Sequence, residues 1–95
     1  MMTFPRSASR KVFENDRIVA WNYTWTVGAH TAMHFHDKDV VVVYLGDGLL
    51  KSVPLTGASD EKEHKTGEIH FNKANRIHYE VLENGSLSAI IVELK

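Results

Sequence analysis

The sequence contains no cysteine, which excludes disulfide bonds, thiolate metal ligands and a cysteine nucleophile. It also has almost no excess charge: 11 Lys and Arg residues stand against 12 Asp and Glu residues, for a formal net charge of -1. A nearly neutral chain has no general attraction for phosphate backbones or anionic lipids. We therefore expect neither a nucleic-acid partner nor a membrane partner.

Long hydrophobic runs are missing as well. The longest one, residues 40–45, is far shorter than the roughly 20 apolar residues that cross a bilayer. The first residues, MMTFPRS, lack the apolar core of a secretory signal peptide. These absences predict a cytoplasmic protein, and a chain of 95 residues has room for one domain.

The hydrophobic pattern is that of β-strands. Apolar and polar residues alternate over residues 19–27, a period of two that is typical of a half-buried strand. The β-branched run at 40–45 predicts a strand covered on both faces. Further strands are predicted at 49–53, 61–65, 68–72, 77–82 and 87–94, and no stretch has a helical period over the length of a helix.

Glycine and asparagine mark the connections between these strands. Gly46 to Gly48 predict a turn that brings 49–53 back as the antiparallel partner of 40–45. Asn84-Gly85 is the strongest hairpin signal, because both residues tolerate positive φ. Many short strands with such turns indicate an all-β fold, an antiparallel sandwich or small β-barrel formed by residues 11–95. We expect residues 1–10 to be loosely ordered or engaged with a partner subunit.

Six histidines in 95 residues are the unusual feature of the composition. His34 and His36 flank Phe35, and residues two apart in a strand point to the same face. Two imidazoles on one face can converge on one metal ion, since imidazole binds zinc, iron, nickel and copper. Taken alone, the pair fits two solvated surface histidines equally well.

The neighbourhood of this pair resembles the first motif of the cupin superfamily. That motif is a glycine, five residues, His-x-His, a short spacer, a glutamate, six residues and a glycine. Gly28, His34, His36 and Gly48 stand at the matching positions. The glutamate position falls at Val41, or at Val40 if the spacer is one residue shorter, and valine cannot bind a metal.

Residues 67–78 resemble the second cupin motif, which ends in a third metal-binding histidine, here His78. Lys73 and Asn75 replace the proline and glycine of its turn; asparagine is the residue besides glycine that best tolerates the left-handed conformation. The chain is most similar to small single-domain RmlC-like cupins, including those associated with β-alanine degradation, over residues 12–17, 39–49 and 92–95. The resemblance implies a jelly-roll-like double-stranded β-helix, and small cupins are commonly homodimers.

The resemblance also implies a metal centre at His34, His36 and His78. Three neutral imidazoles can hold a divalent transition metal (zinc, iron, nickel or manganese), with water in the remaining positions. We expect Val41→Glu to tighten binding if the new carboxylate reaches the ion. Two native carboxylates are candidates for completing the ligand set. Glu80 lies two residues beyond His78, although a solvated charge is its commoner role, and the aspartate at position 39 is better suited to backbone hydrogen bonds.

The other histidines and the aromatic residues have more ordinary interpretations. His70 is equally compatible with a position in the barrel interior and an exposed one, whereas His30 and His64 are expected to be solvated. The aromatic residues of the 19–27 strand are expected in the core or at a subunit interface, with ligand stacking as the less frequent alternative. A small barrel has difficulty covering all of its large apolar residues, which independently favours a homodimer; the residues concerned include Phe4, Phe13, Trp21 and Trp25.

Three functions remain open at this point. The first is a metal-binding cupin of unassigned role, and the second is a metal-dependent enzyme, of dioxygenase or isomerase/decarboxylase type, acting on a small polar metabolite. The third is a metal-free barrel that binds a small ligand. The sequence offers no arginine clamp for a substrate, because the only arginine near the motifs is Arg76 in the second-motif turn.

Overall fold

The computed structural model describes residues 8–31 and 33–95 and contains only strands and their connections within them. The strands are β1 (Ser9–Glu14), β2 (Ile18–Thr24), β3 (His34–Phe35), β4 (Val40–Leu45), β5 (Gly48–Pro54), β6 (Asp60–His64), β7 (Ile69–Asn72), β8 (Ile77–Gly85) and β9 (Ser88–Leu94). This confirms the predicted all-β fold. Among the described residues there is no helix long and apolar enough to cross a membrane.

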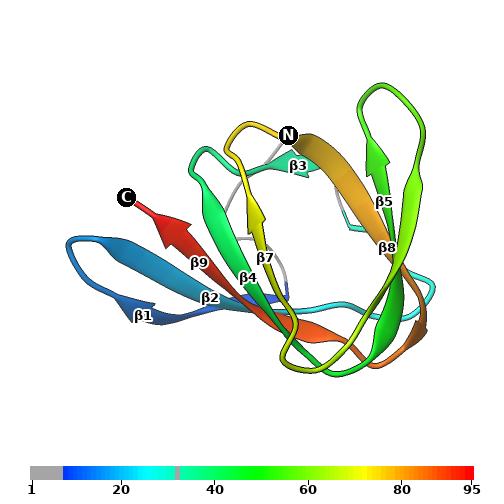
Figure 1. Cartoon of the computed structure of the whole chain (residues 1–95), viewed down its shortest axis with the longest axis horizontal. Coiled ribbons are helices and arrows are strands. Elements are labelled where there is room, and N and C mark those ends of the chain that lie inside the picture. The colour runs from blue at the N-terminus through cyan, green and yellow to red at the C-terminus, as the bar shows by residue number, and fades with distance from the viewer. Residues whose placement is uncertain (1–7, 32) are drawn as a thin grey trace.

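The strands form two antiparallel sheets that face each other as the walls of a barrel (Figure 1). The five-stranded sheet has the order β1-β2-β9-β4-β7, and the four-stranded sheet has the order β3-β8-β5-β6. Of the expected loose N-terminal segment 1–10, residues 1–7 lie outside the described part of the chain. Ser9 and Arg10 begin β1, opposite Tyr23 and Asn22 of β2.

The core lies between the two sheets and is filled by alternate residues of each strand. On β4, Val40, Val42 and Tyr44 are buried, whereas Val41 and Val43 are only partly covered. The prediction that this strand is covered on both faces was therefore wrong, because its outer face has no second layer. The central apolar cluster consists of Tyr23, Trp25, Val40, Val42, Tyr44, Leu50, Leu82, Leu87, Ala89 and Ile91.

Two of the predicted hairpins are crossings between the sheets. β4 pairs with β7 and β9 and not with β5, while β8 and β9 belong to different sheets. The crossings pass very close to each other: a Cβ on Gly46 would meet the carbonyl oxygen of Ser86, and one on Gly85 would meet that of Asp47. Both glycines also have positive φ, 111° and 96°. The glycine signals therefore mark tight crossings and not two-stranded hairpins.

The tryptophans are covered within one chain. Trp21 and Trp25 are both buried, and the indole Nε1 of Trp21 donates a hydrogen bond of 2.8 Å to the buried carboxylate of Glu93. Phe13, in contrast, is exposed, and Phe4 lies outside the described residues. Of the two positions expected for the aromatic residues of the 19–27 strand, core or subunit interface, the structure confirms the core for both tryptophans, because the two facing sheets enclose them.

Candidate metal centre

Strand pairing brings the three predicted ligands together. His34 on β3 is the direct cross-strand partner of His78 on β8, and His36 follows immediately after β3. All three side chains are buried, and each offers a nitrogen within 4.8 Å of the others. The ring centroid of His34 lies 4.6 Å from that of His78 and 5.7 Å from that of His36. The imidazoles thus converge as the motif spacing predicted.

The second-motif turn fixes the backbone beside His36. Asn75 adopts a φ of 69°, and its amide donates a hydrogen bond of 2.6 Å to the carbonyl of His36. The asparagine therefore replaces the motif glycine in a left-handed position, as its conformational tolerance predicted. Asp39 supports the same turn, because its carboxylate accepts the amide of Ala74 at 2.8 Å. Asp39 is thus committed to backbone bonding, the role predicted for it.

Two hydroxyl groups orient the imidazoles of the opposed pair. The Oγ atom of Ser52 lies 2.8 Å from Nδ1 of His78, and Oγ1 of Thr31 lies 3.5 Å from Nδ1 of His34. With Nδ1 engaged in this way, Nε2 is the atom that each ring would offer to a metal. Neither hydroxyl was predicted from the sequence: Thr31 is one of the five residues between the motif glycine and His34, to which the motif gives no role, and Ser52 lies beyond the first motif.

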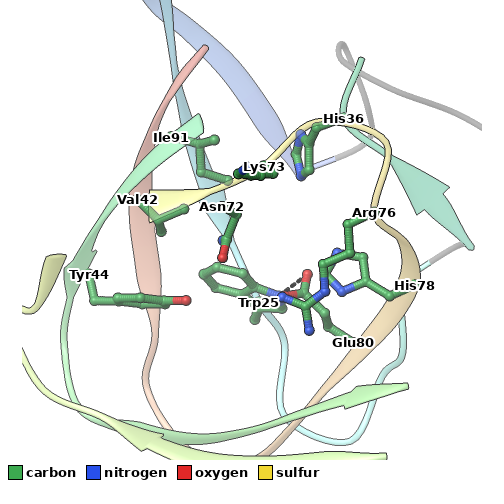
Figure 2. A pocket seen from close by; sticks show the side chains of 10 residues that line it. All are labelled: Trp25, His36, Val42, Tyr44, Asn72, Lys73, Arg76, His78, Glu80 and Ile91. Carbon is green, nitrogen blue, oxygen red and sulfur yellow. Dashed lines mark hydrogen bonds between the residues drawn. The ribbon is translucent and has the colours of Figure 1, made fainter. Parts of the chain in front are cut away.

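Glu80 lies against the histidines and not in solvent. Its Oε1 atom is 3.7 Å from Nε2 of His34 and accepts a hydrogen bond of 3.4 Å from Nε1 of Trp25. Only 13% of its side chain is exposed. The preference for a solvated charge at this position was therefore wrong: Glu80 follows His78 on the inner face of β8 (Figure 2).

Val41 does not occupy the position that a fourth ligand needs. It alternates with the buried Val40 and Val42, so its side chain lies on the outer face of the five-stranded sheet. A carboxylate introduced there points away from the histidines. The condition for tighter metal binding by Val41→Glu, that the new carboxylate reaches the ion, is therefore not met.

Cavities adjoin the histidines inside the barrel. One of about 30 Å³ is lined by Trp25, His36, His78 and Glu80 among others, and Figure 2 shows Arg76 reaching into the same space. A larger one, of about 220 Å³, shares part of this lining. No arginine clamp was predicted from the sequence, yet Arg76, an exposed residue, lines this cavity and its guanidinium donates a 3.4 Å hydrogen bond to a serine hydroxyl.

A second group of ionisable residues borders the larger cavity. Oε1 of Glu68 lies 2.6 Å from Nδ1 of His64 and 2.6 Å from Nε2 of His70. These two contacts lower the pKa of Glu68 from its ordinary value of 4.5 to about 2, and burial lowers the pKa of His64. The expectation that His64 is solvated was wrong, because its ring stacks on the buried Tyr44. His70 faces the cavity, and His30 is exposed as predicted.

The three-histidine group fits a transition metal by the chemistry of its donors. Zinc, iron and related divalent ions favour imidazole nitrogen and accept a carboxylate oxygen. The buried nitrogens of His34, His36 and His78 and the adjacent carboxylate of Glu80 offer that combination on one wall of the barrel. Hydroxyl groups outside the ligand set hold two of the rings, as is usual at metal centres.

Comparison with known proteins shows which solved structures have a similar fold. No protein-family model and no curated protein matches the chain. Among solved structures, a cupin domain from Bordetella pertussis Tohama I has a TM-score of 0.76 at 21% identity, covering 98% of this chain and 99% of that one. An RmlC-like cupin family protein with a double-stranded β-helix fold from Methanocaldococcus jannaschii has a TM-score of 0.72 at 15% identity, covering 97% and 86%.

The polyketide cyclase RemF from Streptomyces resistomycificus is similar as well, with a TM-score of 0.69 at 22% identity over 90% of this chain and 63% of that chain. Likeness at these identities concerns the fold alone. The chain has the cupin fold, the double-stranded β-helix that the motifs implied. The similarity to cupins associated with β-alanine degradation stays a prediction.

Proposed function

We propose that this chain is a small cupin protein that binds one divalent transition metal through His34, His36 and His78. The observation that carries the proposal is the convergence of three buried imidazoles, each with a ligand nitrogen within 4.8 Å of the others. A single divalent ion at this point would bond one nitrogen of each ring.

Glu80 supplies the carboxylate that the first motif lacks. It comes from β8 instead of β4, yet its Oε1 atom is only 3.7 Å from the His34 nitrogen that faces the centre. A carboxylate at this distance binds the ion directly after a small rotation, or accepts a hydrogen bond from a metal-bound water. In either position its negative charge partly offsets the charge of a divalent ion.

The cavity beside the triad favours a metal-dependent enzyme as the second candidate function. Arg76 projects into it, so the space offers a fixed positive charge close to the proposed metal. A small polar metabolite with an anionic group fits these two features. The reaction type, whether dioxygenase or isomerase/decarboxylase, remains open, and the polyketide cyclase similarity concerns only the fold.

The decisive experiment compares the metal affinity of untagged wild type, His78→Ala and the matched control His30→Ala. We expect His78→Ala to weaken binding at the triad by at least about 100-fold, since losing a ligand exceeds the 10–100-fold effect of losing a residue that orients one. His30 is exposed, so its variant is expected to bind like wild type. Equal binding by all three proteins, or none by wild type, contradicts the proposal and favours the metal-free ligand-binding barrel.

The cytoplasmic location belongs to the same proposal. The chain has no cysteine and so no need of an oxidising compartment for its fold. Neutral composition and a buried polar centre fit a role in metabolite or metal chemistry better than binding to nucleic acid.

A further inference from the structure

Three ligand-type residues that the triad does not use meet beside the larger cavity, which is lined by two of them, His64 and His70. His64 is the last residue of β6, Glu68 lies in the turn that follows, and His70 is on β7. One carboxylate oxygen, Oε1 of Glu68, is 2.6 Å from a nitrogen of each imidazole. Two sheets therefore contribute to one cluster, because β6 and β7 belong to opposite walls of the barrel.

The two imidazole rings have the spacing of rings that share an ion. Their centroids are 5.3 Å apart and their planes cross at 83°. With a metal–nitrogen distance of about 2 Å and a tetrahedral angle, two ring centroids lie about 5 Å apart. The centroid distances within the first triad, 4.6 and 5.7 Å, lie on either side of the same value.

The carboxylate has the freedom to admit an ion. Ligand atoms on a tetrahedral zinc ion are separated by about 3.3 Å, so Oε1 has to withdraw from each nitrogen by about 0.7 Å. The Glu68 side chain is 28% exposed and can make this movement. The His64 ring, in contrast, is held in place by the Tyr44 ring, which stacks on it with a centroid distance of 3.9 Å.

We propose that His64, Glu68 and His70 form a second metal site, which binds a divalent transition ion of the zinc class. Two imidazoles and one carboxylate are a ligand set that zinc uses with a fourth, open position for water or a ligand. His64 and His70 line the larger cavity, which is also lined by His78 and Glu80 of the first site. The second ion joins the two sheets at β6 and β7, and the site does not depend on the first triad.

The test is a Zn²⁺ titration against a chromophoric chelator, with ¹¹³Cd NMR of the same proteins to separate the two environments. We expect wild type to bind two equivalents and give two ¹¹³Cd resonances. His70→Ala is expected to retain one equivalent, at the triad. Glu68→Gln keeps the shape of the side chain and is expected to weaken the second equivalent at least tenfold. Glu63→Gln changes an exposed carboxylate on β6, next to His64 in sequence, and should behave like wild type.

The triad variant makes the two proposals separable. His78→Ala is expected to keep the equivalent bound by His64, Glu68 and His70. If wild type binds an equivalent that His70→Ala loses and His78→Ala keeps, this result supports the second site even if the triad binds no metal. The second site is overturned if wild type binds a single equivalent that only His78→Ala removes. It is equally overturned if Glu68→Gln and His70→Ala, folded by circular dichroism, both retain two equivalents; the three residues then form a metal-free hydrogen-bonded cluster.

Discussion

Ser52 determines which nitrogen of His78 faces the proposed metal. Its hydroxyl is 2.8 Å from Nδ1 of His78 and also accepts a hydrogen bond from the guanidinium of Arg76. When Nδ1–H donates to the serine, the lone pair on Nε2 is directed to the ion. One hydroxyl therefore connects the ligand histidine to the positive charge in the cavity.

Removal of this hydroxyl is expected to weaken metal binding while leaving the fold intact. Ser52→Ala frees the His78 ring to rotate and to change tautomer, and losses of this kind lower metal affinity by about 10–100-fold. Ser88→Ala is the matched control, because that hydroxyl bonds an exposed backbone carbonyl. Titration of both variants with Zn²⁺ checks the prediction, which an unchanged affinity in Ser52→Ala contradicts.

The positions of the triad residues were predictable because parity and motif spacing are local properties. His34 and His36 share a strand face by their separation alone, and the second motif supplies His78. The neighbours of the triad were not predictable in the same way. Ser52 lies opposite Glu80 in the β5–β8 register, a pairing between residues 28 apart in sequence that no local pattern encodes. Burial of Glu80 follows from that pairing, so the sequence alone favoured a solvated charge.

At the scale of the elements, local signals located strands well and partners poorly. The predicted strands at 40–45, 49–53 and 68–72 overlap β4, β5 and β7 closely. The glycines after β4 and β8 show why the pairing failed: a reversal of direction looks the same in sequence whether the next strand joins the same sheet or the opposite one. The choice depends on packing of the two sheets, which involves residues far apart in the chain.

The crossing between β4 and β5 is expected to be far less tolerant of substitution than an open loop. Gly46→Ala places a methyl group against the backbone of Ser86 and forces a φ of 111° on an L-residue. Gly57→Ala has a similar φ of 97° but meets no atom within 4 Å, so it carries only the backbone strain, about 1–2 kcal/mol. Urea denaturation should rank Gly46→Ala well below Gly57→Ala, and equal stabilities contradict the prediction.

The β1–β2 hairpin is tied to the chain end by one carboxylate. Glu14 lies 2.7 Å from the ammonium of Lys11 and 2.9 Å from that of Lys95. Hydrogen bonds to these two ammonium groups lower the pKa of Glu14 from its ordinary value of 4.5 to about 2. Because the unfolded chain takes up this proton near pH 4.5 and the folded chain only near pH 2, the stabilisation is present above 4.5 and is lost between the two values.

This linkage predicts a pH-dependent effect of Glu14→Gln. The variant is expected to melt slightly below wild type at pH 7, and the difference should vanish as the pH falls towards about 2. The effect is small because the ion pair is exposed and screened by salt. Melting temperatures of both proteins across this range check it; a difference that persists at the acidic end contradicts the assignment to the charged carboxylate.

On the scale of the whole molecule, the outer face of the five-stranded sheet carries several exposed apolar side chains. One row across all five strands, in register, consists of Phe13, Ala20, Val92, Val41 and Phe71. The phenylalanines at the two ends are 53% and 55% exposed, and the row contains no charge. Such a face is unusual on a monomer and is typical of a protein–protein interface.

We expect a second copy of this chain to cover this outer sheet face. The predicted homodimer then depends on the exposed row and not on covering the tryptophans, which are buried within one chain. A charge-free apolar row of this kind is complementary to itself under two-fold symmetry. Light scattering of wild type at micromolar concentration should give about twice the chain mass of 10.8 kDa. Phe71→Glu, which puts a charge into the row, should give the single-chain mass. Leu55→Glu, at a residue that is 57% exposed just beyond β5 of the other sheet, should leave the dimer intact. A single-chain mass for wild type, or an unchanged mass for Phe71→Glu, contradicts an interface on this face.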